Sequence, residues 1–289
     1  MTTNPGSPVP SRNRAAVLAI GSELLSGQTV NSNASWISTR LVDLGFEVVR
    51  HHVVDDIDID IRSGLDSLAP VADTLIVTGG LGPTSDDLTR QAVAMWCGLP
   101  LKYDDASWQH IVEIFARMQR SVPETNKQQC YFPETARVLT NRAGTANAFT
   151  VQAKSKEVWV LPGPPHEVSA IWEDHVHPTL RDRVPEPSRR RLLSWRTIGR
   201  GESHLAEHIG PLLKDRKNLE IAYRAHAPFV ELKIRYLPAD QASTLELAEK
   251  ITAALAPWLY EINDQDVPSE LLERMSRFKS IEVWDGVTQ

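Results

Sequence analysis

The chain has 289 residues and a formal net charge of −6, from 31 lysines and arginines and 37 aspartates and glutamates. This acidity argues against a general nucleic-acid-binding surface. No apolar run approaches the length of about 18 residues that a membrane span needs. The two cysteines, Cys97 and Cys130, lie in no CxxC pattern, which favours a reducing, cytoplasmic location.

The first half of the chain alternates between strand-like and helix-like segments. Residues 1–14 are rich in proline, serine and asparagine, so we expect a disordered lead rather than an export signal. Strands are predicted at 15–20, 46–54 and 74–78, and helices at 31–44, 58–68 and 87–96. This alternation predicts a parallel sheet with right-handed crossovers, whose ligand lies beyond the carboxyl ends of the strands.

The second half predicts the rest of a large α/β domain and then a smaller one. A helix is expected at 106–119, a polar loop at 123–129 and a buried strand at 158–161, after which Pro164 and Pro165 suit the first turn of a helix. The charged stretch 178–187 is a candidate boundary, so the large domain is placed at 15–185. The order of strands 191–198, 220–224 and 229–237 with helices 202–213 and 239–258 predicts a small α+β domain at 190–262. The tail, 263–289, holds one helical run and one strand-like run.

The most informative stretch follows the predicted strand 74–78. Gly79, Gly80 and Gly82 allow the backbone to turn and to approach a ligand without Cβ strain. Thr84 is predicted as the N-cap of the next helix, and Asp87 stands at the capping-box spacing. Backbone N–H groups at the start of a helix suit an anion. The stretch therefore predicts a phosphate site.

Two adjacent acids, Asp86 and Asp87, complicate this prediction because they would repel a phosphate. A divalent cation held by one or both would remove the repulsion and bridge to the phosphate oxygens. We therefore predict a metal-assisted phosphate site; the alternative, that both acids only cap a helix, is equally open. Glu23 follows the predicted strand 15–20 and Glu167 begins a helix, so either carboxylate is a candidate metal ligand or general base.

Other polar residues carry weaker signals. Asn33 and Asn126 are candidates for nucleotide contacts, although an N-cap and a turn explain them equally simply. His204 and His208 have the i, i+4 spacing of a zinc pair, but no third ligand is evident.

Five blocks in order resemble the CinA family of competence/damage-inducible proteins. They are Gly21-Ser22-Glu23 through Asn33, Val77 through Asp87, Pro123-Glu124-Thr125-Asn126-Lys127-Gln128, Gly144-Thr145-Ala146, and Leu161 through Glu167. A later match is Gly199-Arg200-Gly201-Glu202-Ser203. The resemblance extends over residues 15–260. It implies a three-layer, molybdopterin-binding-like (MoaB/Mog-like) α/β domain with a mostly parallel sheet, followed by a small KH-like α+β domain.

The resemblance also implies a function, namely metal-dependent pyrophosphatase activity on ADP-ribose or a related nucleotide. The implied cofactor is Mg²⁺, Mn²⁺ or Co²⁺, with K⁺ as a further candidate ion, and the implied assembly is a homodimer. Asp86 and Asp87 are the expected metal ligands and, with Glu23 and Glu167, the expected catalytic residues. The expected nucleotide-binding residues lie in the same motifs: Gly21, Ser22, Asn33, Gly79, Gly80, Leu81, Gly82, Pro83, Thr84, Asn126, Gly144, Thr145 and Gly163.

The chain departs from the family pattern at several points. Asn147 and Ala148 follow Gly-Thr-Ala where the family has Pro-Gly, and Thr125 replaces an asparagine. Full-length members also carry a deamidase domain. We expect no deamidase activity here, because the chain stops where that domain would begin. Two alternative functions stay open: a binding module for molybdopterin or a nucleotide, and a non-catalytic protein associated with competence or DNA damage. The small domain lacks the GxxG loop of a KH nucleic-acid clamp.

Overall fold

The computed structural model describes residues 13–262. The predicted lead, except for its last two residues, and the predicted tail elements lie outside these described residues. The chain divides between Pro185 and Glu186 into two compact units, which we call the large unit and the small unit. None of the helices at 13–262 is long and apolar enough to cross a bilayer.

The large unit is built on a six-stranded sheet with the order β2-β1-β3-β8-β7-β6. Strands β1 (Arg14–Ile20), β2 (Glu47–Val54), β3 (Thr74–Thr78) and β8 (Lys156–Leu161) run parallel. Strands β7 (Ala148–Ala153) and β6 (Arg137–Leu139) add an antiparallel edge that the sequence analysis did not predict. A separate two-stranded ribbon pairs β4 (Leu101–Tyr103) with β5 (Tyr131–Pro133). The predicted mostly parallel sheet is confirmed.

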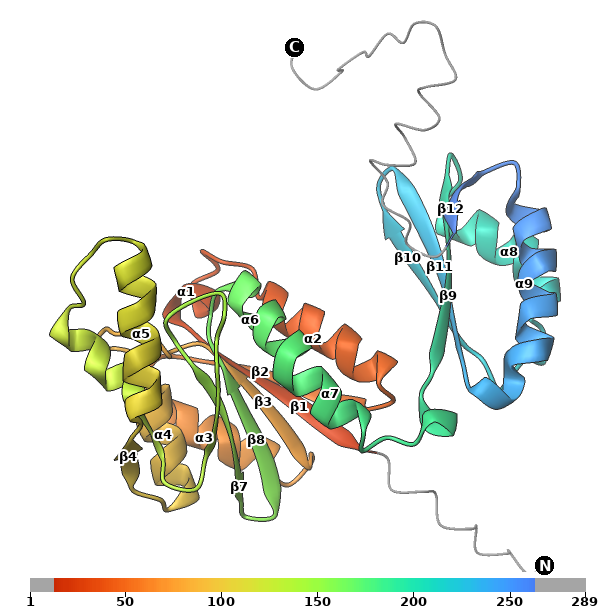
Figure 1. Ribbon diagram of the computed structural model, residues 1–289. Coiled ribbons are helices and arrows are strands. Elements are labelled where there is room, and N and C mark those ends of the chain that lie inside the picture. The colour runs from red at the N-terminus through yellow and green to blue at the C-terminus, as the bar shows by residue number, and fades with distance from the viewer. Residues whose placement is uncertain (1–12, 263–289) are drawn as a thin grey trace, which may run out of the picture. The chain divides into compact units, whose positions relative to one another are not determined.

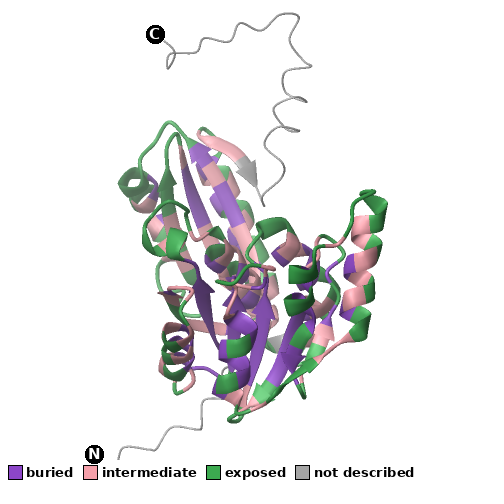
Figure 2. Ribbon diagram, turned by 90° about the vertical axis from the view of Figure 1, so that its left-hand side faces the viewer, coloured by how far each residue is buried: buried purple, intermediate pink, exposed green. Residues whose placement is uncertain are grey.

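Helices cover both faces of this sheet, so the large unit has three layers (Figures 1 and 2). One face packs against α3 (Asp58–Leu68) and α4 (Thr89–Cys97), and its core includes Leu65, Leu75 and Val93. The other face packs against α2 (Ser32–Asp43), α6 (Pro165–Ile171) and α7 (His177–Arg181), with Ile76 and Trp159 in its core. A π-helical segment, Trp172–Val176, joins α6 to α7. Strand β3 is buried along its whole length, as expected for a strand with helices on both sides.

The helix boundaries agree with the local signals in most places. Asn31 caps α2 by accepting a hydrogen bond from the N–H of Ala34 at 3.1 Å. Gly45 and Gly98 follow α2 and α4 with φ of 92° and 70°, the left-handed backbone that glycine adopts most easily. Short α1 (Ser22–Leu25) follows β1, and α5 (Asp105–Arg117) occupies the predicted helix at 106–119.

Two local predictions were wrong. The helix after β3 begins at Thr89 rather than residue 87, and its N-cap, Leu88, makes no side-chain cap bond. Asp87 is instead used within the preceding loop, as described below. The segment 123–129 was expected to be a loop, but it forms a 3-10 helix, η1 (Glu124–Cys130).

The small unit has the element order β9 (Arg191–Ile198), α8 (Glu202–Leu213), β10 (Glu220–His226), β11 (Phe229–Tyr236), α9 (Gln241–Leu255) and β12 (Leu259–Ile262). Its antiparallel sheet has the order β10-β11-β9-β12. Helices α8 and α9 pack on one face, where Trp195, Ile209, Leu232 and Ile251 form the core. Strand β12 was not predicted; the other elements match the predicted order. The small α+β architecture is therefore confirmed.

Candidate functional site

The carboxyl ends of the parallel strands surround a small pocket of about 80 Å³ in the large unit. It lies where β1 leads into α1 and where β3 leads into the glycine loop, at the sheet edge on which ligands of such folds bind. The pocket brings together four residues that the sequence analysis selected: Glu23, Asn33, Gly79 and Gly163. Asn33 also donates its side-chain N–H to the carbonyl oxygen of Gly163 at 2.7 Å, which ties α2 to the loop before α6.

Glycine is required at the start of the loop after β3. Gly79 has φ of 103° and Gly80 has φ of 64°, a region that other residues rarely occupy. A Cβ atom at Gly79 would overlap the carbonyl oxygen of Ile20, and one at Gly80 would overlap the hydroxyl of Thr89. The loop therefore lies directly against the end of β1, which explains how two strand ends form one site.

Asp87 folds back onto this loop. Its carboxylate accepts hydrogen bonds from the N–H of Gly82 at 2.7 Å, the N–H of Thr84 at 2.8 Å and the hydroxyl of Thr84 at 2.5 Å. The loop N–H groups of Gly82 and Thr84, which we expected to be available to an anion, are thus occupied by the chain's own carboxylate. Thr84 is not the N-cap of α4; it closes a turn with Asp87, whose N–H donates to the Thr84 carbonyl oxygen at 3.1 Å.

Side chains from α4 and η1 bind the carbonyl oxygens of the loop; two of them, Arg90 and Gln129, are buried and were not selected by the sequence analysis. The Arg90 guanidinium donates to the carbonyl oxygen of Leu81 at 2.9 Å, and Gln129 donates to the same oxygen at 3.1 Å. Gln128 donates to the carbonyl oxygen of Thr84 at 2.5 Å. Burial lowers the pKa of Arg90 to about 10, and the nearby Asp87 opposes that shift. Gln128 of the 123–128 motif and the adjacent Gln129 thus support the glycine loop.

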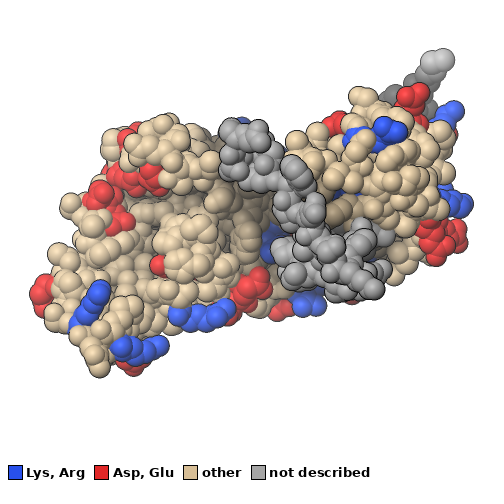
Figure 3. All heavy atoms as spheres, turned by 90° about the horizontal axis from the view of Figure 1, so that it is seen from above, with Lys and Arg blue, Asp and Glu red and all other residues tan. Residues whose placement is uncertain are grey.

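Asp56 lies close to the start of α1 and within reach of the charges of Glu23 and Asp86. Asp56, which follows β2, accepts a hydrogen bond from the N–H of Ser22 at 2.9 Å. Burial raises the pKa of Asp56; the Ser22 bond opposes this shift, and Glu23, Asp55 and Asp86 raise the pKa further. Figure 3, seen from the end of the large unit at which α1 lies, shows acidic side chains at several separate places among mostly uncharged residues. Asp56 carried no sequence signal, because only the tertiary fold brings it to Ser22.

The acids near the pocket offer oxygen donors of the kind that a divalent ion uses when phosphate and water complete its shell. No group of three or more histidine, cysteine, aspartate or glutamate side chains is arranged to hold a metal by itself within residues 13–262. Mg²⁺, however, commonly uses only one or two carboxylates and completes its shell with substrate phosphates and water. The carboxylates of Asp86, Glu23 and Asp56 are hard oxygen donors of the required kind. Asp87 differs from them, because three loop donors already occupy its carboxylate.

Glu167 belongs to a second group of polar residues, around the loop between β6 and β7. Its carboxylate accepts a hydrogen bond from the side-chain N–H of Asn141 at 2.6 Å and lies against Gly144, where any side chain would overlap it. Burial raises the pKa of Glu167, and the Asn141 bond opposes that shift. His110 on α5 donates from Nε2 to the carbonyl oxygen of Gly144 at 3.1 Å.

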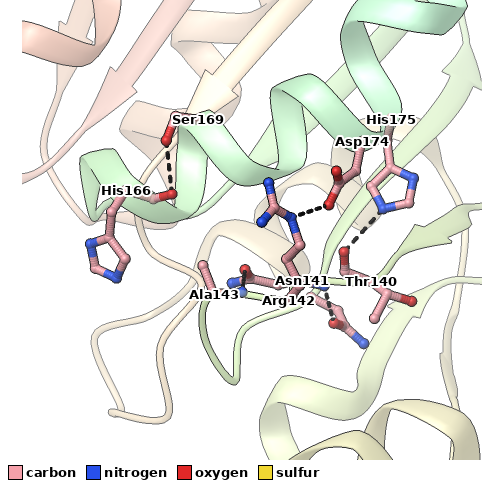
Figure 4. Close-up of polar contacts among 9 residues, drawn as sticks. Thr140, Asn141, Arg142, Ala143, His166, Ser169, Asp174 and His175 are labelled. Atoms are coloured by element: carbon pink, nitrogen blue, oxygen red, sulfur yellow. Dashed lines mark hydrogen bonds and ion pairs between the residues drawn. The ribbon is translucent and has the colours of Figure 1, made fainter.

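The same loop is anchored to the helix that follows β8, as Figure 4 shows. The Arg142 guanidinium pairs with Asp174 at 2.7 Å, and His175 donates to the carbonyl oxygen of Thr140 at 3.0 Å. Within the described residues, no hydrogen bond or ion pair joins this group to Asp86 or Asp87. The structure therefore places the sequence-selected residues in two groups, one around Glu23 and the glycine loop and one around Glu167 and Gly144.

The remaining candidates make local contacts or lie half-buried within their own segments. Asn126 is buried and donates to the carbonyl oxygen of Pro123 at 3.2 Å, as the turn interpretation predicted. Gly21 lies against the Glu23 carboxylate, and Pro83 and Thr145 are half-buried beside their motif neighbours. His204 and His208 both contact the edge of Trp258 in the small unit, and no third metal ligand joins them among the described residues.

Comparison with known proteins matches each of the two units to a domain family. The family model described as Probable molybdopterin binding domain matches residues 16–182, and the model described as Damage-inducible protein CinA KH domain matches residues 194–260. The crystal structure of the protein CinA from Thermoplasma acidophilum is 29% identical with a TM-score of 0.54; the match covers 58% of this chain and 98% of that one.

Longer bacterial relatives give the same assignment. A competence-damage inducible protein, as its name describes it, from Caldicellulosiruptor saccharolyticus is 34% identical over 90% of this chain and 64% of its own length. A similarly named protein from Clostridium novyi is 37% identical over 87% of this chain and 59% of its own length. The chain thus spans less than two thirds of these relatives. From the two family matches and these relatives, we conclude that the chain belongs to the CinA family.

Proposed function

We propose that this protein is a divalent-metal-dependent pyrophosphatase that hydrolyses ADP-ribose or a related nucleotide. The observation that carries the proposal is the pocket at the carboxyl ends of β1 and β3, where Glu23 and Gly79 meet. Its volume of about 80 Å³ is far below the roughly 300–1,000 Å³ of sites that enclose a whole drug-sized ligand. The pocket therefore suits the phosphate part of a nucleotide, with the remainder extending over the surface.

The acids near this pocket would repel a bound phosphate unless a positive ion lay between them and the phosphate. A bound divalent ion would offset the charge of the pyrophosphate oxygens and lower the pKa of a bound water. Asp86, Glu23 and Asp56 are the residues proposed to hold it. Asp87 is proposed to shape the loop, because its carboxylate is held by Gly82 and Thr84.

The reaction itself requires a base and a place for the leaving phosphate. A water oxygen attacks one phosphorus, the bridging P–O bond breaks, and the bridging oxygen leaves with the second phosphate; from ADP-ribose the products are AMP and ribose 5-phosphate. Two carboxylates are candidates to accept the water's proton. Glu23 lines the pocket itself, and Glu167, whose pKa is raised by burial, is a stronger base than an exposed glutamate. Gly79 and Gly163 allow the backbone to approach the phosphates.

A product assay with matched variants tests this function. Purified protein is incubated with ADP-ribose and Mg²⁺, Mn²⁺ or Co²⁺, in potassium and in sodium buffers, and AMP is quantified. We expect metal-dependent AMP formation that Asp86→Asn and Glu23→Gln reduce strongly. Asp182→Asn, which removes an exposed acid at the end of α7, is the control and should match the wild type. AMP formation that persists in the Asp86→Asn, Glu23→Gln double variant would contradict the proposed mechanism.

The family assignment supports two competing functions that the same preparation can test. The description of the matched domain favours molybdopterin as a ligand; tight pterin binding without nucleotide turnover would select a binding module. The names of the relatives refer to competence and damage. Stoichiometric copurification with a recombination protein, again without turnover, would select a non-catalytic role.

We also propose a homodimer in the cytoplasm. The proposal of a dimer rests on the family resemblance. Light scattering after gel filtration measures the molar mass in solution and so tests it directly. The location rests on the cysteine pattern of the sequence, in which neither Cys97 nor Cys130 stands in a CxxC motif, as is common in a reducing compartment.

A further inference from the structure

Arg90 lies under the glycine loop, in surroundings that make a positive charge costly. It is the second residue of α4, where the positive end of the helix dipole disfavours a cation. It is only 4% exposed, and a charge inside a protein loses its hydration, so arginine is rarely buried without a carboxylate beside it. Burial lowers the pKa of Arg90 to about 10, which still leaves the guanidinium charged near neutral pH. The cost indicates that the charge itself has a role.

The closest described contacts of Arg90 are with neutral groups. Its guanidinium donates to the carbonyl oxygen of Leu81 at 2.9 Å and lies 5.6 Å from the centre of the Phe132 ring. Its Nε atom has no hydrogen-bond partner among the described residues. A carbonyl oxygen does not need a cation as donor, since the neutral side chain of Gln129 donates to the same oxygen at 3.1 Å. The hydrogen bond alone therefore does not explain why an arginine occupies this position.

One peptide group of the loop lies between Arg90 and the carboxylate of Asp87. Arg90 donates to its oxygen, which belongs to Leu81, and the N–H of the same peptide, which belongs to Gly82, donates to Asp87 at 2.7 Å. The C=O and N–H of a trans peptide point in opposite directions, and hydrogen bonds at its two ends strengthen each other. The charge of Asp87 in turn favours the charged form of Arg90. The two residues thus form a pair of opposite charges across the loop.

Other carbonyl oxygens of the loop are held by the same two elements, α4 and η1. The Thr89 hydroxyl donates to the carbonyl oxygen of Gly79 at 2.8 Å, and Gln128 donates to that of Thr84 at 2.5 Å. Carbonyl oxygens would repel a phosphate, so these contacts keep several of them occupied by the protein. Among these donors Arg90 is the charged one, and it is the one placed opposite a carboxylate.

We propose that Arg90 is a positioning residue for phosphate binding by the glycine loop. It holds the Leu81 carbonyl oxygen away from the ligand and supplies the charge that offsets Asp87. Without that charge Asp87 would repel a phosphate, because charges inside a protein are screened less than in water. Asp86 is then the acid of this pair whose charge the divalent ion must offset. The inference rests on the phosphate site of the proposed function, but it concerns affinity for the anion and not the bond that is hydrolysed.

Isothermal titration calorimetry of the full chain tests the inference. The probe is methylenediphosphonate with Mg²⁺, because its P–C–P bridge is not hydrolysed and binding is measured apart from turnover. Arg90→Gln keeps an N–H donor and loses the charge, so it should weaken binding by about tenfold or more. Arg90→Lys keeps the charge and should bind like the wild type. A role limited to the hydrogen bond predicts the reverse, since a glutamine can donate to Leu81 as Gln129 does.

Two further variants make the comparison specific. Lys156→Gln removes a cation from the amino end of β8, where Lys156 pairs with Asp73 at 2.9 Å, and should leave the affinity unchanged. The double variant Arg90→Gln, Asp87→Asn removes both charges of the pair and should bind more tightly than Arg90→Gln alone. Circular dichroism establishes whether each variant is folded. If Arg90→Gln alone is unfolded, the double variant replaces it and should bind like the wild type, because the pair has no net charge in either protein.

The outcomes separate this inference from the proposed function. Wild-type affinity in Arg90→Gln, or equal losses in Arg90→Gln and Arg90→Lys, would overturn the role of Arg90 and leave the phosphate site standing. A loss in the double variant as large as that in Arg90→Gln would do the same. A wild-type protein that does not bind methylenediphosphonate would overturn both the inference and the phosphate site. Binding that depends on the charge of Arg90, without AMP formation from ADP-ribose, would support the inference and contradict the pyrophosphatase proposal.

Discussion

Asp86 and Asp87 are neighbours in the chain but have opposite surroundings. Asp87 accepts three hydrogen bonds from Gly82 and Thr84 and lies near the buried Arg90, whose charge it favours. Asp86 is exposed and raises the pKa of Asp56 through its charge. The two acids therefore have separable roles, one within the loop and one toward the proposed ion.

Alanine substitutions should separate these roles. Asp87→Ala leaves loop N–H groups without their acceptor, and since hydrogen bonds to charged groups contribute roughly 1.5–3 kcal/mol, it should lower both stability and AMP formation. Asp86→Ala should remove AMP formation and lower the free energy of unfolding much less, because Asp86 is exposed and the Thr84 hydroxyl is the one side chain whose hydrogen bond lowers its pKa. Urea unfolding and the AMP assay measure the two effects. Equal destabilisation by both substitutions would contradict the separation.

The surroundings of Glu167 predict the pH dependence of the reaction. Burial raises its pKa above the ordinary value for glutamate, so its basic form is lost as the pH falls through that raised value. The acid side of the profile of kcat/KM against pH should therefore fall at a higher pH than an exposed glutamate would give. Glu167→Gln should slow the reaction about 10²- to 10⁴-fold and remove this limb; a variant that keeps the wild-type profile would exclude Glu167 as the base.

At the scale of elements, the connection from β3 to α4 depends on a close approach to β1. Gly79→Ala places a methyl group on the Ile20 carbonyl oxygen in a backbone conformation with positive φ. Gly27→Ala is the matched control, because Gly27 has φ of 76° and no atom within 4 Å of the added Cβ. The control should cost about 1–2 kcal/mol for the backbone alone. Gly79→Ala should cost about a further 1–3 kcal/mol from overlap, as measured by urea unfolding; similar costs for both would contradict the contact.

At the scale of the whole molecule, separate cores predict separate unfolding. The large unit packs both sheet faces around Leu75 and Ile76, whereas the small unit packs Ile251 against Trp195 and Leu232. Ile251→Ala should destabilise the small unit by about 2–5 kcal/mol and leave AMP formation unchanged. Calorimetry should show one shifted and one unshifted transition. A common shift of a single transition would show that the units unfold together.

Most elements could be predicted because their signals are local. The apolar run at β3 and the spacing of Ile37 and Leu41 in α2 report burial directly, since a side chain's neighbours along the chain determine its face. The glycines of the loop after β3 likewise indicate a turn. Of the candidate site, the sequence selected Glu23, Asn33, Gly79 and Gly163, which the structure brings to one pocket.

By itself, then, the sequence determined the order of the elements, the family motifs and the position of the glycine loop. Only the tertiary structure decided that Asp87 occupies the loop donors, that Arg90 lies buried beneath them, and that Asp56 joins Glu23 near the pocket. It alone also revealed the antiparallel strands β6 and β7 at the edge of the large sheet. The physical reason is separation along the sequence. Periodicity and turn chemistry depend on residues a few positions apart, whereas these contacts join residues that come together only when the chain folds.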